Sequence, residues 1–428
     1  MTTLQIENPK SKTETRATKN PYAPPRPYVP AARKLRVLLI SHTCQSRTEG
    51  QPKAHALANL PDLDLHLLTP ARWLHYGKWR PAQPPLHPNP THPTFQTTIA
   101  PIRLPWLGPA QSFLHYYPSL PKILRTFRPD VIDLWEEPWS YVSAHTCRMR
   151  NRLLPTAKIV SETEQNIYKE LPFPFESFRT YTLKNTDLAI ARSPEALQIL
   201  RQKGHHGPGQ VVPNAVDVAL FRPMNRAECR EKLQEALSKI ENRTSTIESP
   251  FIAGYIGRLV PEKGLTDLCD ALPFAPQNAH VLFIGDGPLA PELHAQAARL
   301  NISHRVHFLP NQPLENLPAL MNALDVLVLP SRTTRSWKEQ FGRVLIEAGA
   351  CRIPVIGSDS GAIPDVISGA GLLAPEQNPQ ALANAFTTLA RDPCVADSLA
   401  QHAYENAHTC FTWEKVAQTM ARLYHSLY

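Results

Sequence analysis

Short apolar runs alternate with helix-like segments along both halves of this chain, and this alternation limits the folds that are open to it. Near-continuous apolar runs are typical of strands that are buried on both faces in a parallel sheet. The runs lie at 35–41, 63–69, 130–134, 158–161, 187–191 and 211–212 in the first half, and at 251–259, 281–288, 306–310, 325–330 and 354–359 in the second. The pattern predicts an α/β fold of two doubly wound domains, with a ligand cleft between them at the carboxyl edges of both sheets.

The most informative segment is 330–367, which reads PSRTTRSWKEQFGRVLIEAGACRIPVIGSDSGAIPDVI. It places Glu339 and Glu347 eight residues apart, on either side of Phe341 and Gly342. Eight helical residues turn about 80° beyond two full turns, so the two carboxylates would not share a face of one helix. We therefore expect Glu339 in a loop and a helix that begins near Phe341 or Gly342, with its free N–H groups facing an anion. A pair of solvated surface glutamates is the alternative.

Composition and length describe an ordinary globular protein with room for two domains. The chain has 428 residues, of which 42% are hydrophobic and 19% charged, and a domain typically takes about 100 to 200 residues. We expect a cytoplasmic protein, since no apolar run reaches the roughly 18 residues of a membrane span and the first residues lack an apolar signal core. The seven cysteines are scattered without a CxxC pair, which indicates reduced thiols and no structural zinc.

The net charge of +8 is concentrated near the start of the chain. Residues 1–34 hold seven lysines and arginines against two glutamates, a net of +5, and are rich in proline. We predict a disordered basic tail there, and an irregular insertion over the mouth of the first domain at 72–109, which is dense in proline, histidine and aromatics. Either could bring the protein to the inner face of the cytoplasmic membrane as a peripheral contact; a solubilising leader is the other reading of the tail. No nucleic-acid-binding module accompanies the charge, so we expect no nucleic-acid partner.

A second polar constellation follows the first strand of the second half, in GRLVPEKG at 257–264. Gly257 lets the backbone turn at the strand end, and Arg258 and Lys263 could grip a diphosphate, the arginine through a bidentate fork and the lysine as a point charge. Two exposed cations on a surface loop are the alternative. No GxGxxG follows a strand and no GxxxxGK[ST] is present, which argues against nicotinamide-dependent enzymes and P-loop NTPases.

Polar residues at strand ends of the first half carry weaker signals. His42, His55 and His145 occur singly, and a single histidine is more often structural or solvated than a base. Glu136 and Glu137 are adjacent, so if they continue a strand they point opposite ways and at most one faces the cleft.

The segments GRLVPEKG, GDGP (285–288) and 330–367 together closely resemble the retaining GT-B glycosyltransferases of glycosyltransferase family 4. PNAVDVALFRP (213–223) is similar to the interdomain segment of that family, and FTWEKVAQTMARLY (411–424) to its last helix. The resemblance covers roughly 35–428. It implies a GT-B architecture with an N-terminal acceptor-binding domain at 35–215, a C-terminal donor-binding domain at 216–410, and a final helix at 411–428 that packs back on the first domain.

The resemblance also implies a donor site and a reaction. Its residues would be Gly257, Arg258, Lys263, Glu339, Phe341, Gly342 and Glu347. Arg258 and Lys263 would hold the diphosphate, with main-chain amides at the helix start assisting. Glu339 would bind hydroxyls of the transferred sugar and Glu347 the ribose, and Glu339, Arg258 and Lys263 would be the catalytic group. Such enzymes transfer a hexosyl group from a nucleoside diphosphate sugar to a glycan or lipid-linked acceptor with retention of configuration. They usually need no metal or other cofactor, so we expect none.

The first half departs from the family pattern. Many members carry a Gly-Gly step after the first strand, but the loop here reads SHTCQSRTEGQPKAH with Gly50 alone, and WEEPWS lacks the histidine often found after a mid-domain strand. The acceptor-side candidates that remain are Glu137, Glu162 and Asn166. These departures leave two alternatives to an active transferase, a non-catalytic sugar-nucleotide-binding protein of the same fold and a nucleotide-sugar epimerase.

Overall fold

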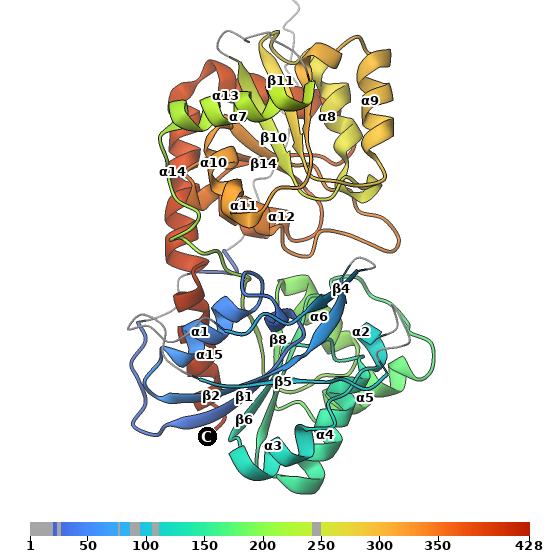
Figure 1. Cartoon of the computed structure of the whole chain (residues 1–428), viewed down its shortest axis with the longest axis vertical. Helices are drawn as coiled ribbons and strands as arrows, with labels where there is room; N and C mark the ends of the chain where they lie inside the picture. Colours follow the sequence, from blue (N-terminus) through green and yellow to red (C-terminus); the bar gives the residue numbers. More distant parts are fainter. Residues whose placement is uncertain (1–19, 24–26, 76–77, 86–94, 105–110, 242–249) are drawn as a thin grey trace, which may run out of the picture.

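A computed structural model describes residues 20–23, 27–75, 78–85, 95–104, 111–241 and 250–428. The chain forms two lobes stacked along the long axis, each a parallel sheet covered by helices (Figure 1). This architecture confirms the prediction of an α/β fold with two doubly wound domains.

The first sheet has seven parallel strands in the order β5-β2-β1-β6-β7-β8-β9. Its strands are β1 (Leu35–Ile40), β2 (Leu63–Pro70), β5 (Gln96–Ala100), β6 (Val131–Leu134), β7 (Lys158–Thr163), β8 (Leu188–Ala191) and β9 (Gly209–Val211). The helices of this domain are α1 (Gln51–Ala58), α2 (Gln111–Leu114), α3 (Leu120–Phe127), α4 (Tyr141–Leu153), α5 (Phe175–Lys184) and α6 (Pro194–Gln202). All four residues of β6 and of β8 are buried, as expected for central strands covered on both faces.

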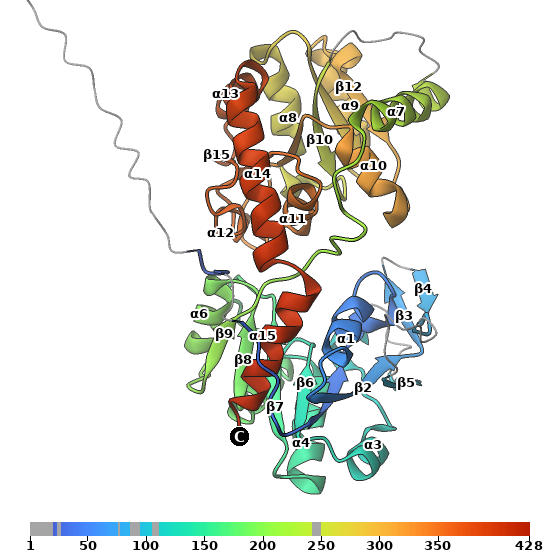
Figure 2. The same ribbon diagram turned by 90° about the vertical axis from the view of Figure 1, so that its left-hand side faces the viewer.

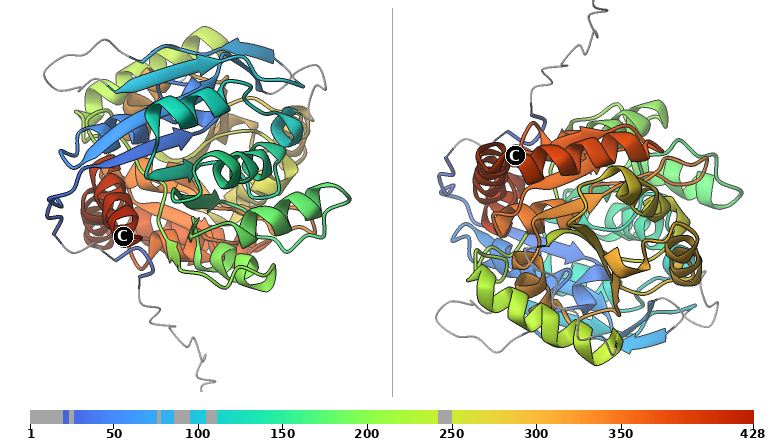
Figure 3. Two further views of the ribbon diagram at one scale, coloured as in Figure 1. Left: turned by 90° about the horizontal axis from the view of Figure 1, so that it is seen from below. Right: turned by 90° about the horizontal axis from the view of Figure 1, so that it is seen from above.

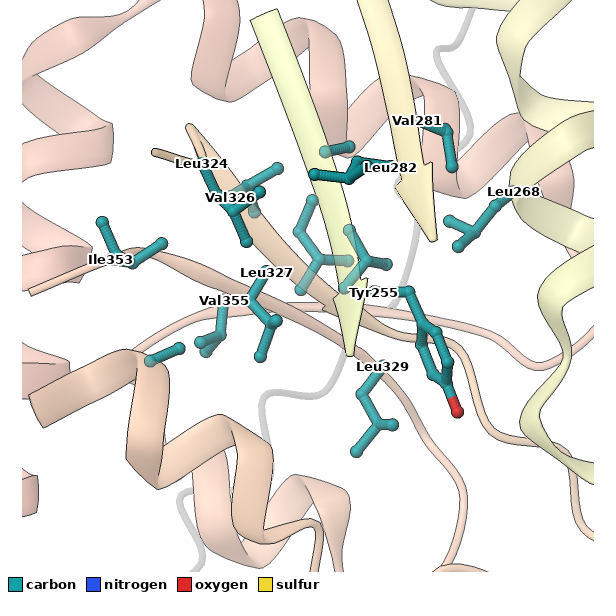
Figure 4. Packing of buried hydrophobic residues seen from close by; sticks show 14 of the residues in the cluster. Tyr255, Leu268, Val281, Leu282, Leu324, Val326, Leu327, Leu329, Ile353 and Val355 are labelled. Atoms are coloured by element: carbon teal, nitrogen blue, oxygen red, sulfur yellow. The ribbon is translucent and has the colours of Figure 1, made fainter. Parts of the chain in front are cut away.

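The second sheet has six parallel strands in the order β12-β11-β10-β13-β14-β15. They are β10 (Phe251–Ile256), β11 (Ala279–Ile284), β12 (Val306–Leu309), β13 (Val326–Leu329), β14 (Val355–Ser358) and β15 (Leu372–Ala374). The helices are α7 (Arg226–Glu241), α8 (Leu265–Ala271), α9 (Ala290–Arg299), α10 (Leu317–Asn322), α11 (Arg343–Ala350), α12 (Ile363–Ile367), α13 (Pro379–Arg391) and α14 (Pro393–Cys410). Figure 4 shows Val326, Leu327 and Val355 in the packed core beside β10, while the Tyr255 hydroxyl points toward the carboxyl end of that strand.

The helix α15 (Trp413–His425) returns from the second domain to the first. It continues the path of α14 along one side of both lobes (Figure 2), and both end-on views place the pair at the same edge of the molecule (Figure 3). Val416, Met420 and Tyr424 on its inner face are buried in the same apolar cluster as the first sheet. A bridge between Val216 and Thr412 places the two interdomain crossings side by side.

The segment 72–109 is more regular than the sequence predicts. β3 (Arg72–His75) and β4 (Lys78–Pro81) form an antiparallel hairpin, and β5 pairs with β2 as the edge of the main sheet. The prediction of an irregular insertion is therefore wrong for these strands; 76–77, 86–94 and 105–109 lie outside the described residues. The edge position explains the error, because most of β5 is partly or fully exposed and lacks the continuous apolar run of a central strand.

Part of the predicted disordered tail is ordered in the structure. Residues 1–19 and 24–26 lie outside the described residues, but Tyr22 is only 3% exposed. Its hydroxyl donates to the carbonyl of Arg192 in the first domain at 2.8 Å. Its ring lies edge-on to Phe341 and Phe411, with centroids 5.7 and 5.5 Å away. Tyr22 thus connects the first domain to the second at the point where the chain crosses between them.

Replacing Tyr22 by alanine is expected to destabilise the protein by about 3 to 5 kcal/mol, because an aromatic side chain leaves a buried site. The Tyr22→Phe variant keeps both ring contacts and loses one hydrogen bond, so about 1 kcal/mol is expected. Urea denaturation followed by tryptophan fluorescence would measure both. Identical midpoints for the wild type and Tyr22→Ala would show that this residue does not hold the two domains together.

Candidate active site

The loop between β13 and α11 carries the central acidic residue of the site. The helix begins at Arg343, and Gly342 caps it with φ of 84°, a conformation that few residues other than glycine adopt. Glu339 therefore lies in the loop and Glu347 in the second turn of the helix, as the spacing predicts. The first N–H groups of α11 open toward the same end of the sheet as this loop.

Glu339 and Lys263 form a close ion pair at the carboxyl edge of the second sheet. The Lys263 Nζ lies 2.6 Å from Glu339 Oε2, and the Ser331 hydroxyl donates to the same oxygen at 2.8 Å. The ammonium also lies 4.7 Å from the centre of the Trp337 ring. Since the side chains of Lys263 and Glu339 are 16% and 10% exposed, the pair is shielded but not fully buried. The structure thus brings together two residues that are 76 positions apart in the sequence.

The main chain of Glu339 is fixed from both domains. Its carbonyl accepts the Asn166 side-chain amide at 2.7 Å and the N–H of Ala362 at 3.1 Å. Asn166 belongs to the first domain and is only 2% exposed. The sequence interpretation groups Asn166 with the acceptor, but the structure directs its amide onto the loop that carries Glu339. Its observed contact is therefore one that positions this loop.

The other predicted donor residues surround this pair at different depths. Gly257 directly follows β10, and the Arg258 side chain is 49% exposed with its guanidinium 3.9 Å from Glu262. Glu347 is buried, which raises the pKa of its carboxyl group, and lies 3.6 Å from the Arg343 guanidinium.

The Phe341 ring is 2% exposed and lies in the core of the second domain. Only its main chain is therefore placed to serve a ligand.

A cavity of about 330 Å³ lies between the two domains. The loops after β1 and β6 and the end of β7 contribute to its first-domain wall. Gln340 and Arg343 come from the second domain, and Trp413 comes from α15. The cavity borders the loop that carries Glu339, because Gln340 is the next residue. The sequence analysis predicts a ligand cleft between the two domains, and this cavity lies there.

Glu136 and His42 form an ion pair in the wall of this cavity. The Glu136 carboxylate accepts the His42 N–H at 2.7 Å and lies 2.7 Å from His42 Nδ1. Although burial opposes the charged form, the Glu136 carboxylate raises the pKa of His42. The sequence did not favour His42 among the single histidines; its place directly after the first strand was the available signal.

Glu137 also lines the cavity, so the prediction that at most one of the two adjacent glutamates faces the cleft is wrong. Both residues follow the end of β6 at Leu134, where the chain is no longer extended and the alternation of a strand does not apply. The Glu137 carboxylate accepts from the Thr163 hydroxyl at 2.7 Å and from the N–H of Glu164 at 2.9 Å. Burial raises its pKa to about 7.

Glu162, the third acceptor-side candidate, is held inside a buried charge network. It forms ion pairs with Lys53 and Arg192, and its side chain is only 1% exposed. Although burial opposes ionisation, these two cations lower the pKa of Glu162. Its carboxylate supports the wall of the cavity and is not positioned as an open hydrogen-bonding group.

Comparisons with known proteins identify the fold. Over 92% of this chain, the structure matches all of the Anabaena protein HepE in complex with UDP and glucose at a TM-score of 0.63 and 19% identity. It also matches 99% of the sucrose-phosphate synthase of Thermosynechococcus elongatus at a TM-score of 0.63 and 22% identity, again over 92% of this chain. The chain has the GT-B fold. Its residues 238–409 match the family described as Glycosyl transferases group 1.

Curated relatives of this GT-B chain include several named D-inositol 3-phosphate glycosyltransferase. The one from Corynebacterium jeikeium is 27% identical over 69% of this chain and 68% of its own length. The one from Streptomyces bingchenggensis is 36% identical over 50% of this chain and 47% of its own length. The chain thus spans between about half and two thirds of the length of these relatives.

Gly50, the single glycine in the loop between β1 and α1, is required by the close packing of the backbone around it. A Cβ atom on Gly50 would lie 2.5 Å from the nitrogen of Cys44 and from the carbonyl carbon of Thr43. No other residue type fits there without moving the backbone. Gly50 therefore keeps the loop after β1 folded on itself, and this loop presents His42 and Thr43 to the cavity.

Two features of the described residues bear on metals and membranes. Within these ranges, His, Cys, Asp and Glu side chains form no group of three or more that could hold a metal ion. None of the helices built by the same residues combines the length and apolar character needed to span a membrane.

The raised pKa of Glu137 predicts a pH-dependent stability. The unfolded chain ionises this group near pH 4.5, whereas the folded chain holds the proton until about pH 7. The folded state therefore loses stability from this group as pH rises between these values. Relative to a Glu137→Gln variant, the wild type should lose roughly 1 to 2 kcal/mol of unfolding free energy between pH 5 and pH 8. Urea denaturation at several pH values measures this, with Glu414→Gln as an exposed control; parallel curves for wild type and Glu137→Gln would contradict the assignment.

Proposed function

We propose that this protein transfers a hexosyl group from a nucleoside diphosphate sugar to a hydroxyl-bearing acceptor, with retention of configuration and without a metal. The observation that carries this proposal is the shielded Lys263–Glu339 pair beside the start of α11. A cation, a carboxylate and the N–H groups of a helix start suit a ligand with an anionic diphosphate and a sugar with many hydroxyls. The names of the glycosyltransferase relatives and the UDP in the HepE complex support the same class of donor.

Each donor-side residue has a role in this proposal. Lys263 has three N–H donors, so its ammonium can bind a phosphate oxygen while it keeps Glu339 in place. Arg258, about half exposed on the loop after β10, adds a bidentate contact to the diphosphate. Glu339 accepts hydrogen bonds from hydroxyls of the transferred sugar, and Glu347 does the same for the ribose. The Phe341–Gly342 main chain contributes the helix start that faces the phosphate.

The proposed reaction occurs on one face of the sugar. The bond from the anomeric carbon to the diphosphate oxygen breaks as the acceptor oxygen forms a bond to the same carbon from the same face. The departing phosphate oxygen takes the proton of the acceptor hydroxyl. Arg258, Lys263 and the helix start stabilise the negative charge that develops on the leaving group, a contribution that preorganised cations and dipoles make most strongly in a shielded site.

The proposal also covers where the acceptor binds and where in the cell the reaction takes place. The first domain binds the acceptor, a glycan or lipid-linked sugar, in the cavity that Glu137 lines. We place the reaction in the cytoplasm, with the basic charge of 1–34 as a peripheral contact to anionic lipid headgroups where the acceptor is lipid-linked.

Purified protein incubated with UDP-, GDP- and ADP-sugars tests the proposal. Release of nucleoside diphosphate that increases with glycan or lipid extracts, and continues in the presence of a chelator, is the expected result. The anomeric configuration of the product, read by NMR, tests retention. Binding of a nucleotide sugar without any release would favour a non-catalytic binding protein, and conversion of the donor sugar without acceptor would favour an epimerase.

A further inference from the structure

The cavity between the domains is acidic as well as aromatic. Four carboxylates line it in addition to that of the buried Glu162: Glu49, Glu136, Glu137 and Glu164. Among the described lining residues, the potential cations are His42 and Arg343. Since burial raises the pKa of Glu137 to about 7, the negative charge that an anionic ligand would meet comes mainly from Glu49, Glu136 and Glu164.

Each of these two lining cations already faces a carboxylate. His42 contacts both oxygens of Glu136 through its main-chain N–H and its ring. The Arg343 guanidinium lies 3.6 Å from Glu347. A phosphate in the cavity would have to compete with these carboxylates for its counter-charge.

Two cations that lie deeper, Lys53 and Arg192, are also paired with carboxylates. Lys53 and Arg192 are turned toward Glu162 below the cavity wall, and Arg192 also lies 3.7 Å from Glu164. Lys53 and Arg192 are only 2% and 3% exposed, so their positive charges are balanced by buried carboxylates inside the protein. They offer no contact to a phosphate in the cavity.

Two tryptophans give the cavity aromatic surfaces on which an apolar face of a ligand can pack. Trp135 and Trp413 both line the cavity. The Trp135 ring is held by the Lys53 ammonium at 4.6 Å and the Arg192 guanidinium at 5.7 Å from its centroid, a cation–π arrangement that fixes its orientation. The C–H face of a sugar ring packs on such a surface by burial and dispersion, while its hydroxyls donate to carboxylates.

We propose that the acceptor is an uncharged hydroxyl-bearing ring, a sugar or cyclitol without a phosphate group, and that the carboxylates of the cavity exclude phosphorylated acceptors. This inference rests on the proposed function and narrows its acceptor. It separates this chain from the relatives named for D-inositol 3-phosphate. The mechanism is like-charge repulsion in a partly enclosed site, where it is less screened than at an open surface.

Direct binding tests the proposal without depending on which donor is used. Saturation-transfer NMR and calorimetry on the full chain would compare inositol with inositol 3-phosphate, and methyl glucoside with its 6-phosphate. We expect the uncharged member of each pair to bind at least about a hundredfold more tightly at low salt, with a smaller ratio at high salt. Equal or tighter binding of the phosphorylated members would overturn the proposal, as would no binding of either member at high millimolar concentration.

A charge variant provides the second measurement. In the double variant Glu49→Gln, Glu164→Gln the affinity ratio of uncharged to phosphorylated ligand should fall about tenfold, since two carboxylates no longer repel the phosphate. Glu228→Gln, on the exposed surface of α7, should leave the ratio unchanged. An unchanged ratio in the double variant would contradict the electrostatic explanation. Release of nucleoside diphosphate, measured separately on the same samples, distinguishes a failure of this inference from a failure of the proposed function.

Discussion

Substituting Glu339 by alanine is expected to lower kcat/KM for sugar transfer by about a thousandfold, a loss typical of removing one preorganised polar group from a transition-state site. The carboxylate fixes Lys263 at 2.6 Å and, in the proposed function, orients the transferred sugar. Its loss would release the cation that neutralises the leaving diphosphate as well as the contact to the sugar. Both effects act on the same step, so kcat should fall more than donor affinity.

Two further variants separate charge from geometry at this site. Glu339→Gln keeps an oxygen for the Ser331 hydroxyl but carries no charge, so its activity should lie between those of the wild type and the alanine variant. Glu315→Ala removes an exposed carboxylate of the same domain and should match the wild type. Steady-state release of nucleoside diphosphate measures all three, and circular dichroism checks that each is folded. An alanine variant with wild-type activity would eliminate Glu339 from the catalytic group.

The sequence predicts the arrangement of the second-domain residues well because that arrangement is built locally. Glu339, the helix start at Gly342 and Glu347 belong to one strand–loop–helix unit, so spacing along the chain determines their relative positions. Arg258 and Lys263 follow β10, which pairs directly with β13, so both loops emerge at the same sheet edge. Loops that follow adjacent parallel strands lie at the same edge of the sheet, so the proximity of these motifs can be predicted from the sequence.

The arrangement of the first-domain residues could not be predicted from the sequence, because contacts between distant parts of the chain bring these residues together. Asn166 reaches the carbonyl of Glu339 across 173 positions, and Lys53 reaches Glu162 across 109. No periodicity in the sequence encodes such pairs. The sequence pattern suggested that Glu136 and Glu137 continue a strand, whereas the chain bends at Glu136 after β6 and both residues line the cavity. The edge strand β5 was missed because its partial exposure removes the apolar signal that marks central strands.

Substituting Glu162 by glutamine is expected to destabilise the protein by about 3 to 5 kcal/mol, the cost of breaking a buried ion pair from one side. Glu162 faces Lys53 and Arg192, whose side chains are 2% and 3% exposed. Asp133 lies 3.1 Å from Lys53 and accepts the Tyr424 hydroxyl at 2.7 Å, so the network also ties α15 to the first domain. Removing the Glu162 charge leaves Lys53 with Asp133 and leaves Arg192 with the more exposed Glu164, 3.7 Å away.

A double-mutant cycle measures the interaction itself. Lys53→Met alone leaves Glu162 and Asp133 with Arg192 as the remaining cation of the network. Lys53→Met together with Glu162→Gln leaves Arg192 with Asp133 and Glu164. The double variant should therefore be less destabilised than the sum of the two single variants. The matched control is Glu195→Gln, which removes the partner of Lys338 in a more exposed interdomain pair and should cost less than about 1 kcal/mol.

The pH dependence distinguishes an ionised network from a neutral one. Since Lys53 and Arg192 lower the pKa of Glu162, its stabilising charge is present above the ordinary carboxyl value of 4.5 and is lost only as pH falls through the lower folded value. Burial and the neighbouring Glu162 also raise the pKa of Asp133 to about 7, so Asp133 contributes to the pH dependence between pH 5 and pH 8. The range that reports Glu162 lies below pH 4.5, where the difference between wild type and Glu162→Gln should shrink as the pH falls. A difference that did not shrink there would mean that Glu162 is already protonated in the folded state. The cations beneath Trp135 would then lack the counter-charge that keeps them turned away from the cavity.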